Sequence, residues 1–232
     1  MQLYMSFLTF KAQQYPNIQS MRTAITHEEQ NKRLLKAIAK IKQKRGFKCR
    51  NCSGTKYYEI GEGFARKCKH CKRTESVIAN TIFAGQRVPV ATVFSILEAL
   101  KENVLTVKEE ANAMWDSYFE WRKEMESIYG RHREYGYQPG FERKLRTIES
   151  RYIIPSEQLA KMFDLRQKTI WALVNKLANA VPEDFDDPLR VGYKGMDETN
   201  QKKYGRFASL LATCEMNRIL EYYVTLDPDV VS

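Results

Sequence analysis

The chain of 232 residues contains 38 lysines and arginines against 28 aspartates and glutamates, which gives a formal charge of +10 at pH 7. This length allows one large domain or two smaller ones, and hydrophobic residues, at 43% of the chain, can build a core. The positive excess favours a polyanionic partner, most often nucleic acid. No apolar run approaches the roughly 20 residues of a membrane span, so the sequence predicts no membrane protein. The first ten residues lack the features of a signal peptide, and we expect a cytoplasmic protein.

The first predicted segment, residues 1–46, is basic and helical. A capping box at Thr26 opens its helix, which ends at Gly46. Nine lysines and arginines and no acidic residue lie between Lys32 and Arg50. Two interpretations of this positive face remain open: a solvated helix surface, or a surface that contacts phosphate groups.

Four of the five cysteines form two Cys-x-x-Cys pairs with fifteen residues between them: Cys49, Cys52, Cys68 and Cys71. This spacing is typical of four thiolates that hold one tetrahedral zinc ion. We therefore interpret residues 47–80 as a zinc ribbon with one structural Zn²⁺, and a redox-active dithiol pair is the alternative. Four sulfurs complete the coordination of zinc, so His70 in the second pair is not required as a ligand. The fifth cysteine, Cys214, is expected to be a buried apolar residue.

The residues between the cysteine pairs predict a β-hairpin with strands at 56–60 and 64–67 and a turn at 61–63. Basic side chains surround the expected ligands, where they favour ionised thiolates. These are Lys48, Arg50, Lys67, Lys69 and Lys72.

Residues 81–106 are predicted to connect the ribbon to the rest of the chain, through a helix from about 91 to 104. A second capping-box pattern at Thr106 predicts that a new helix begins there. Apolar residues then recur at alternating spacings of four and three, as in a heptad repeat. They are Val107, Ala111, Met114, Tyr118, Trp121, Met125 and Ile128, and the same rhythm returns at Phe141, Leu145, Ile148 and Tyr152.

We interpret residues 107–154 as an inserted antiparallel helical hairpin. In one interpretation the apolar stripes of its two helices, both within residues 107–153, pack only on each other. In the other, the hairpin also carries the seam of a homodimer, because Trp115 and Phe119 add apolar surface beside the stripe. The sequence favours neither interpretation over the other.

Residues 155–181 have the rhythm of a helix-turn-helix. Ser156 caps the first helix, and Asp164 occupies the turn, where a left-handed backbone is needed. The second helix presents outward-facing polar residues of the types that reach bases and phosphates in a major groove. They are Arg166, Gln167, Lys168, Thr169, Asn175 and Lys176. Trp171 is expected in the core.

Residues 182–232 comprise an acidic loop and a final helix from about 206 to 224. The predicted fold class is therefore mostly α with a small β zinc ribbon, a helix-turn-helix and the inserted helical hairpin.

The order of these elements resembles the N-terminal region of zinc-ribbon insertion-sequence transposases whose nuclease is an ISXO-like DDE domain. The resemblance covers roughly residues 40–105 and 155–180. It rests on Gly46-Phe47-Lys48-Cys49-x-x-Cys52, on Arg66-Lys67-Cys68-Lys69-His70-Cys71, on Thr81-Ile82-Phe83-Ala84-Gly85-Gln86-Arg87-Val88-Pro89, and on Leu159-Ala160, Lys168-Thr169 and Trp171. In the third motif the family typically has glycine where Asn80 stands and threonine where Gln86 stands.

The chain departs from that family in lacking room for the nuclease. Asp197 stands about where the first catalytic aspartate is expected, yet only 33 residues follow Thr199. A catalytic domain of this type needs on the order of 100 residues, with two further carboxylates for a pair of Mg²⁺ ions. We therefore expect no enzymatic activity.

The expected function is non-catalytic, sequence-specific binding of double-stranded DNA by a nucleoid-associated transcription regulator or mobile-element accessory factor. Its expected ribbon contacts are the five basic residues named above and Arg66, and no small-molecule substrate is expected. Two alternatives remain: a protein- or RNA-interaction module built on the ribbon, and a transposase subunit whose site another chain completes around Asp197.

Overall fold

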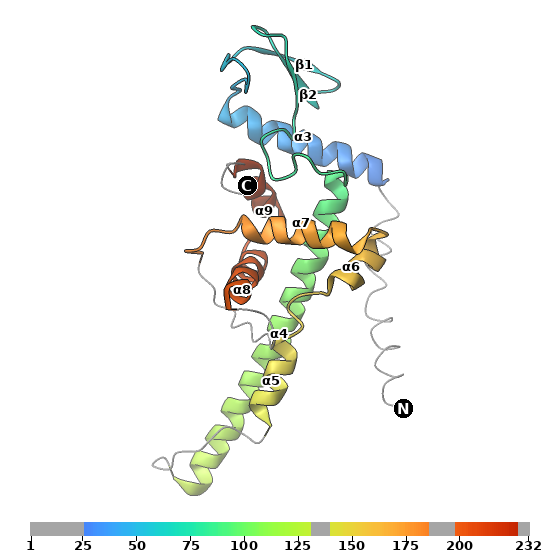
Figure 1. Cartoon of the computed structure of the whole chain (residues 1–232). Coiled ribbons are helices and arrows are strands. Elements are labelled where there is room, and N and C mark those ends of the chain that lie inside the picture. Colours follow the sequence, from blue (N-terminus) through green and yellow to red (C-terminus); the bar gives the residue numbers. More distant parts are fainter. Residues whose placement is uncertain (1–25, 131–139, 186–197, 227–232) are drawn as a thin grey trace. The chain divides into compact units, whose positions relative to one another are not determined.

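The structure, a computed structural model, describes residues 26–130, 140–185 and 198–226 (Figure 1). Within these ranges the chain is mostly helical, with seven helices and one small antiparallel sheet, as the sequence predicts. The helices are α3 (His27–Arg45), α4 (Val90–Tyr129), α5 (Phe141–Glu149), α6 (Ser156–Phe163), α7 (Gln167–Asn179), α8 (Glu198–Thr213) and α9 (Met216–Thr225). The strands are β1 (Tyr57–Ile60), β2 (Ala65–Cys68) and β3 (Thr74–Ser76).

Contacts divide the chain into two compact units. Unit 1 comprises the described residues up to Val77 together with Pro89–Ala91, and unit 2 comprises Ile78–Val88 and the described residues from Thr92 onward. Each unit is described by itself below.

In unit 1, α3 has the boundaries that its sequence predicts. The Thr26 hydroxyl accepts a hydrogen bond from the Glu29 backbone N–H at 3.2 Å, and Gly46 ends the helix with a φ of +83°. That φ favours glycine, because side chains are strained in the left-handed region. On the apolar stripe Ile38 is fully buried, and the Asn31 side chain accepts a hydrogen bond from Ala91 at 3.1 Å.

The sheet has the strand order β1-β2-β3, and both pairings are antiparallel. The predicted β-hairpin is confirmed with small shifts of its bounds, and its register places Tyr58 opposite Lys67. Strand β3 is an addition that the sequence does not predict, because a three-residue run shows no readable periodicity. Arg66 joins the sheet to α3: its guanidinium donates to the Ala39 carbonyl at 3.1 Å and lies 4.8 Å from the centroid of the Tyr57 ring.

Helix α4 corrects the prediction of two helices separated near Thr106. It runs unbroken for 40 residues. The Thr106 hydroxyl donates to the Glu102 carbonyl at 2.9 Å, as a side chain inside a helix does, and does not cap a new one. No glycine or proline interrupts α4, and the apolar stripe passes through Val104 and Val107 without a change of phase. The expected boundary between 106 and 107 is therefore not a helix boundary.

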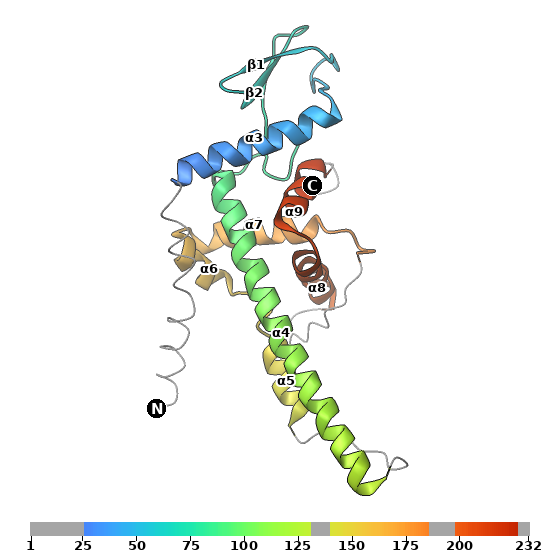
Figure 2. The same ribbon diagram turned by 180° about the vertical axis from the view of Figure 1, so that it is seen from behind.

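In unit 2, α5 runs antiparallel beside the later part of α4 (Figures 1 and 2). The Phe141 ring lies 4.7 Å from the Tyr118 ring, at the start of α5. Beyond its end, the Asn103 side chain donates to the carbonyls of Arg151 and Tyr152 at 2.7 and 3.0 Å. Residues 131–139, which connect α4 to α5, lie outside the described residues.

The predicted heptad positions of α4 differ in burial along the helix. Val107, Ala111 and Tyr118 are buried, whereas Ile128 is 61% exposed. Phe119, beside the stripe, is also exposed. The dimer seam stays a prediction.

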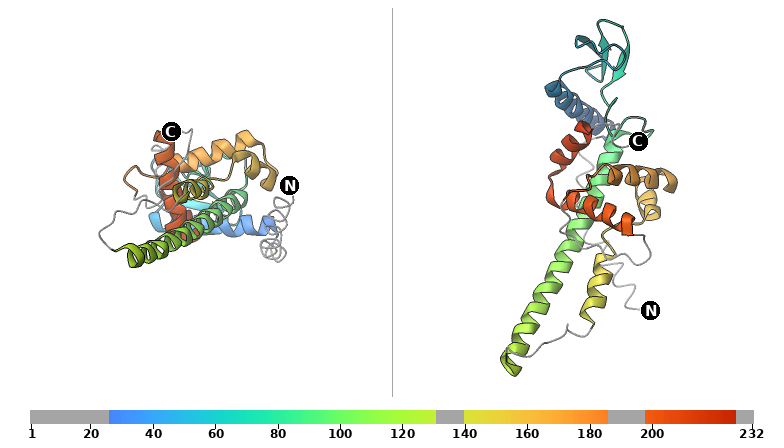
Figure 3. Two further views of the ribbon diagram at one scale, coloured as in Figure 1. Left: turned by 90° about the horizontal axis from the view of Figure 1, so that it is seen from below. Right: turned by 60° about the vertical axis from the view of Figure 1, so that its left-hand side comes forward.

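Helices α7, α8 and α9 pack together in unit 2 (Figure 3). The Tyr223 side chain of α9 is fully buried, and its hydroxyl donates to the Leu177 carbonyl of α7 at 3.0 Å. Burial raises the pKa of Tyr223 well above its ordinary value, so the phenol stays protonated and keeps this hydrogen bond. From α8, the Tyr204 hydroxyl donates to the Asn175 side chain at 2.6 Å.

The Thr81-Ile82-Phe83 segment also belongs to this core. All three residues are buried. The Thr81 hydroxyl donates to the Ile78 carbonyl at 2.7 Å, and the Ile82 backbone N–H donates to the Tyr223 carbonyl at 3.3 Å. The segment thereby ties the start of unit 2 to α9.

The single final helix predicted at 206–224 is wrong, because α8 and α9 are separate and the break falls at Cys214 and Glu215. Cys214 is half-buried at that break and is not the core residue expected. Its carbonyl accepts a hydrogen bond from the Lys101 ammonium group.

Among the described helices, none combines the length and the apolar character that crossing a bilayer requires.

Candidate metal centre

The four sulfurs of Cys49, Cys52, Cys68 and Cys71 lie within 4.8 Å of one another in unit 1. The Cys49 and Cys71 sulfurs are 3.5 Å apart, and those of Cys52 and Cys68 are 3.6 Å apart. Around a tetrahedral ion with metal–sulfur bonds of about 2.3 Å, neighbouring sulfurs lie about 3.8 Å apart. The cluster can therefore hold one metal ion, as the cysteine spacing predicts.

The two Cys-x-x-Cys turns, called knuckles here, share one backbone pattern. In the first, the Cys49 N–H donates to the Gly54 carbonyl at 2.9 Å, and the Ser53 N–H donates to the Cys49 carbonyl at 2.8 Å. In the second, the Cys68 N–H donates to the Arg73 carbonyl at 2.9 Å, and the Lys72 N–H donates to the Cys68 carbonyl at 3.1 Å. Ser53 and Lys72 both have positive φ. Equivalent turns present their sulfurs in equivalent ways, as two halves of one cage require.

Backbone amides prepare the second knuckle for an ion. The Arg73 N–H lowers the pKa of Cys71 to about 6, and the N–H groups of Cys71 and His70 lower the pKa of Cys68. The Gly54 amide acts in the same direction on Cys52, but burial and the three neighbouring thiols together raise the pKa of Cys52 to about 12. Four close thiols resist losing all their protons without a cation, and a metal ion removes that resistance.

Gly54 leaves room for two of the sulfurs. A Cβ atom at this position would lie 3.3 Å from the Cys52 sulfur and 3.4 Å from the Cys68 sulfur. The residue at this point of the knuckle must therefore be very small.

We expect Gly54→Ala to weaken metal affinity by roughly tenfold, because the added methyl group presses on two ligand atoms. Competition with a chelating dye measures the effect. Thr55→Ala, at the exposed neighbouring position, is the control and is expected to leave affinity unchanged. Equal affinity of the Gly54→Ala variant and the wild type would contradict the close packing of Gly54 against the sulfurs.

Most of the basic residues predicted around the cysteines are exposed. Lys48, Arg50, Lys69 and Lys72 are exposed and Lys67 is half-buried. Arg66 is different, because only 5% of its surface is exposed and its guanidinium is bound to α3. Its predicted contact with nucleic acid does not fit this position. The period of two along a strand puts Arg66 on the same face of β2 as Cys68, and this alternation in the sequence could have indicated that Arg66 is buried.

The predicted contacts on α7 also divide into two groups. Arg166, Gln167 and Lys168 are exposed and Thr169 is half-exposed, all at the start of the helix. Asn175 and Lys176 instead contribute to the fold of unit 2. Asn175 accepts the hydrogen bond from Tyr204, and the Lys176 ammonium group donates to the Ala84 carbonyl at 3.2 Å.

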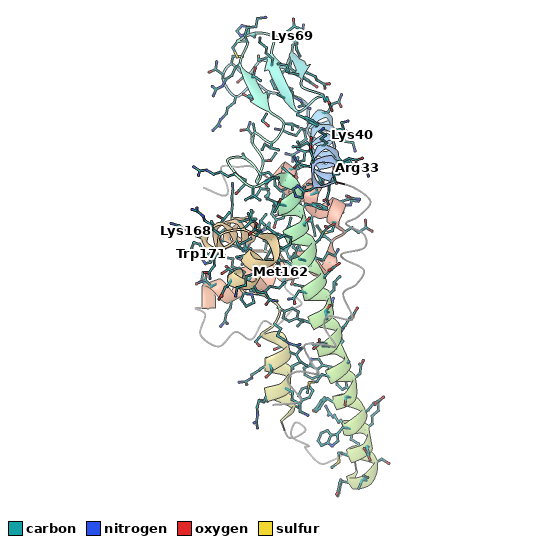
Figure 4. The ribbon with its side chains drawn as sticks, turned by 90° about the vertical axis from the view of Figure 1, so that its right-hand side faces the viewer. Arg33, Lys40, Lys69, Met162, Lys168 and Trp171 are labelled. Atoms are coloured by element: carbon teal, nitrogen blue, oxygen red, sulfur yellow. The ribbon has the colours of Figure 1, made fainter. Side chains whose placement is uncertain are left out.

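Trp171 is a correction, because the sequence places it in the core and the structure leaves it 61% exposed. The buried side of α7 consists of Ile170, Leu173, Val174, Leu177 and Ala178, and Trp171 lies off that side. Figure 4 shows Trp171 and Lys168 together on the outer side of α7. Counting helical phase from Ile170 and Val174 could have identified this exposure.

Positive charge is concentrated in the part of the chain that holds the cysteines. Residues 26–77 contain 15 lysines and arginines and 5 acidic residues, a surplus of ten, which equals the formal charge of +10 of the whole chain. The remaining residues contain 23 of each kind. On α3 the exposed cations include Arg33 and Lys40, and Lys69 extends from the sheet region (Figure 4).

No family model matches the chain, and neither a curated protein nor a solved structure is significantly similar to it. The site is therefore classified from its own residues, as a candidate metal centre of four cysteines within a basic unit. Asp197, the position discussed for catalysis, lies outside the described residues.

Proposed function

We propose that the chain is a non-catalytic, zinc-dependent DNA-binding protein that acts as a transcription regulator or as an accessory factor of a mobile element. The observation that carries the proposal is the charge distribution: the whole positive surplus falls in residues 26–77, around the cysteine cluster. A surface that concentrates cations in this way attracts the phosphate backbone and releases its counterions on binding.

Zinc is the ion that the donor set favours. Four thiolates in a tetrahedral arrangement are typical of structural zinc sites. Cys49, Cys52, Cys68 and Cys71 would occupy every coordination position, so the ion would organise the fold of unit 1 and leave no position for a substrate. Iron is the other ion that such a site accepts.

Helices α6 and α7 support a second contact with DNA. Asp164 joins them in a left-handed conformation, with a φ of +50°, as the turn of a helix-turn-helix requires. Helix α7 contains no acidic residue, and Arg166, Gln167 and Lys168 are exposed at its start, where a recognition helix contacts base edges. The Gln167 amide also donates to the Ser156 hydroxyl at 3.2 Å, which helps to orient it.

The resemblance to the transposase region remains part of the proposal. Asn80 stands where that family typically has glycine, and it has a φ of +57°. Glycine and asparagine are the residues that most readily adopt this conformation, so the substitution preserves the backbone.

Neutralising part of α3 tests the proposal. In the variant Lys36→Gln, Lys40→Gln and Lys44→Gln, all three changes replace exposed cations on one face. Each lost phosphate contact lowers the slope of log K against log salt by about 0.9, so we expect a decrease of up to about 2.7 and weaker binding to all duplexes. Fluorescence anisotropy with a labelled duplex at several salt concentrations measures both quantities.

The matched control removes three exposed cations from unit 2, in Lys123→Gln, Arg143→Gln and Lys144→Gln. It has the same net charge as the α3 variant. If the two variants lose affinity equally, the effect follows total charge and the proposed surface on α3 is wrong.

A further inference from the structure

The sheet of unit 1 has one face that does not pack on α3, called the outer face here. Alternation along the strands places Tyr58 and Ile60 on one face of β1, and their partners across the hairpin are Lys67 and Ala65. The next partners, on β3, are Thr74 and Ser76. Arg66, which reaches α3, lies on the opposite face.

Two large side chains on the outer face are exposed. Tyr58 is 52% exposed and Ile60 is 41% exposed, although both stand in a strand of only four residues. Together they place two large side chains side by side on the same strand face at the surface of a small unit. Their exposed surface is available to a ligand.

Lysines from the second knuckle reach the tyrosine ring. The Lys69 ammonium nitrogen lies 4.5 Å from the centroid of the Tyr58 ring, and that of Lys72 lies 6.0 Å from it. The backbone fixes both lysines, because the Lys69 N–H donates to the Lys56 carbonyl at 2.9 Å and Lys72 stands at the left-handed position of its knuckle. The second knuckle thus sets where the backbone of these two lysines lies beside the aromatic ring.

The outer face carries no acidic residue among its paired strand positions. The acids of the strands, Glu59 and Glu75, lie on the opposite face with Arg66. Lys67 is therefore the one charged residue at the paired positions of this face, and Lys69 and Lys72 add two cations beside the Tyr58 ring.

We propose that the outer face binds an unpaired stretch of nucleic acid, with a base stacked on Tyr58 and neighbouring phosphates held by Lys67, Lys69 and Lys72. This inference rests on the proposed function and adds to it a single-stranded ligand at a site separate from α7. Aromatic side chains on a basic surface are the usual platform for unpaired bases.

Two other occupants fit the surface less well. Bases inside a duplex are stacked on each other, so a ring that projects from a sheet cannot stack on them unless they are unpaired. A protein partner would also use an exposed tyrosine, but lysine is depleted in protein interfaces, and here lysines border the ring.

The test compares a labelled oligo(dT) strand with a labelled duplex, using the full-length, metal-loaded protein and fluorescence anisotropy. We expect Tyr58→Ala to weaken binding of the single strand by about 5- to 150-fold, the loss typical of one stacked base, and to leave duplex affinity within about twofold. Tyr58→Phe keeps the ring and is expected to bind like the wild type. Changing Lys69 and Lys72 to glutamine together should lower the salt slope for the single strand by about 1.4.

Tyr129→Ala is the matched control, because Tyr129 has a similar exposure of 55% and lies in unit 2. Zinc content is measured for every variant. If the Tyr58→Ala variant loses its metal, the Tyr58→Leu variant is tested in its place, because leucine keeps apolar bulk without a stacking ring. In addition, a strand containing 5-iododeoxyuridine is crosslinked to the wild-type protein, and we expect the crosslink in the peptide that contains Tyr58.

The outcomes separate the two proposals. If the duplex binds but the single strand does not, or if the loss of the ring has no effect and the crosslink maps elsewhere, the inference is overturned and the proposed function stands. If neither nucleic acid binds at low salt, the proposed function itself fails. The inference is supported if affinity for the single strand falls only in the Tyr58 variants that lack an aromatic ring.

Discussion

Removal of the metal ion is expected to unfold unit 1 and to leave unit 2 folded. The sheet of unit 1 has strands of four, four and three residues. The buried hydrophobic residues of this unit are few: Ile38, Cys49, Cys68, Val77, Val90 and Ala91. A structural zinc ion contributes roughly 10–16 kcal/mol in small domains of this kind, which exceeds the stability that such a core provides.

Two probes separate the units. All three tryptophans, Trp115, Trp121 and Trp171, lie in unit 2, so tryptophan fluorescence reports on that unit alone. After chelation, or in Cys68→Ser, we expect native tryptophan fluorescence together with loss of amide exchange protection in residues 46–77. Cys214→Ser is the control and is expected to retain the metal. Protection that persists in metal-free protein would contradict this account of unit 1.

Tyr223→Ala is expected to destabilise unit 2 by about 3–5 kcal/mol, the usual cost of truncating a fully buried aromatic residue. The side chain of Tyr223 is fully buried and its hydroxyl donates to the Leu177 carbonyl of α7, while its backbone carbonyl accepts a hydrogen bond from the Ile82 N–H. Denaturant unfolding followed by tryptophan fluorescence measures the loss. Tyr129→Ala, an exposed truncation of the same residue type, is expected to change stability by less than about 0.5 kcal/mol. Because Tyr223 supports α7, specific DNA binding should weaken as well.

The pH dependence of the same residue has a definite sign. The pKa of Tyr223 is raised in the folded state above the unfolded value of about 10. Its contribution to stability is therefore complete below about pH 10 and is lost as pH rises above that value. We expect Tyr223→Phe to be slightly less stable than the wild type at pH 7 and to lose less stability between pH 9 and 11. Parallel losses in the two proteins over that range would contradict the buried phenol.

Local signals in the sequence predicted the parts of the fold that depend on neighbouring residues. Thr26 and Gly46 mark the ends of α3, and the two glycines at 61 and 63 mark the turn of the β-hairpin, because each acts through its own backbone conformation. The cysteine spacing predicted the cluster for a related reason: a Cys-x-x-Cys knuckle is a local turn, and only the meeting of two knuckles is long-range.

The predictions were wrong where contacts between residues far apart in the sequence determine the structure. Thr106 matches a capping box, but helix α4 continues through it because its stripe is covered on both sides of that point. Strand β3 exists only through pairing with β2. The sequence alone predicts that Asn175 and Lys176 are surface residues. In the structure Asn175 is hydrogen-bonded to Tyr204, and Lys176 is hydrogen-bonded to the Ala84 carbonyl. A single sequence contains no signal for such pairings.

The most direct test of the central claim is the affinity of the full chain for duplex DNA, measured against salt concentration with and without the metal ion. We expect tight, steeply salt-dependent binding by protein that carries one zinc ion per chain, and binding weakened by at least tenfold after the metal is removed. Equal affinity of the metal-loaded and metal-free proteins, or binding that does not change with salt, would contradict it.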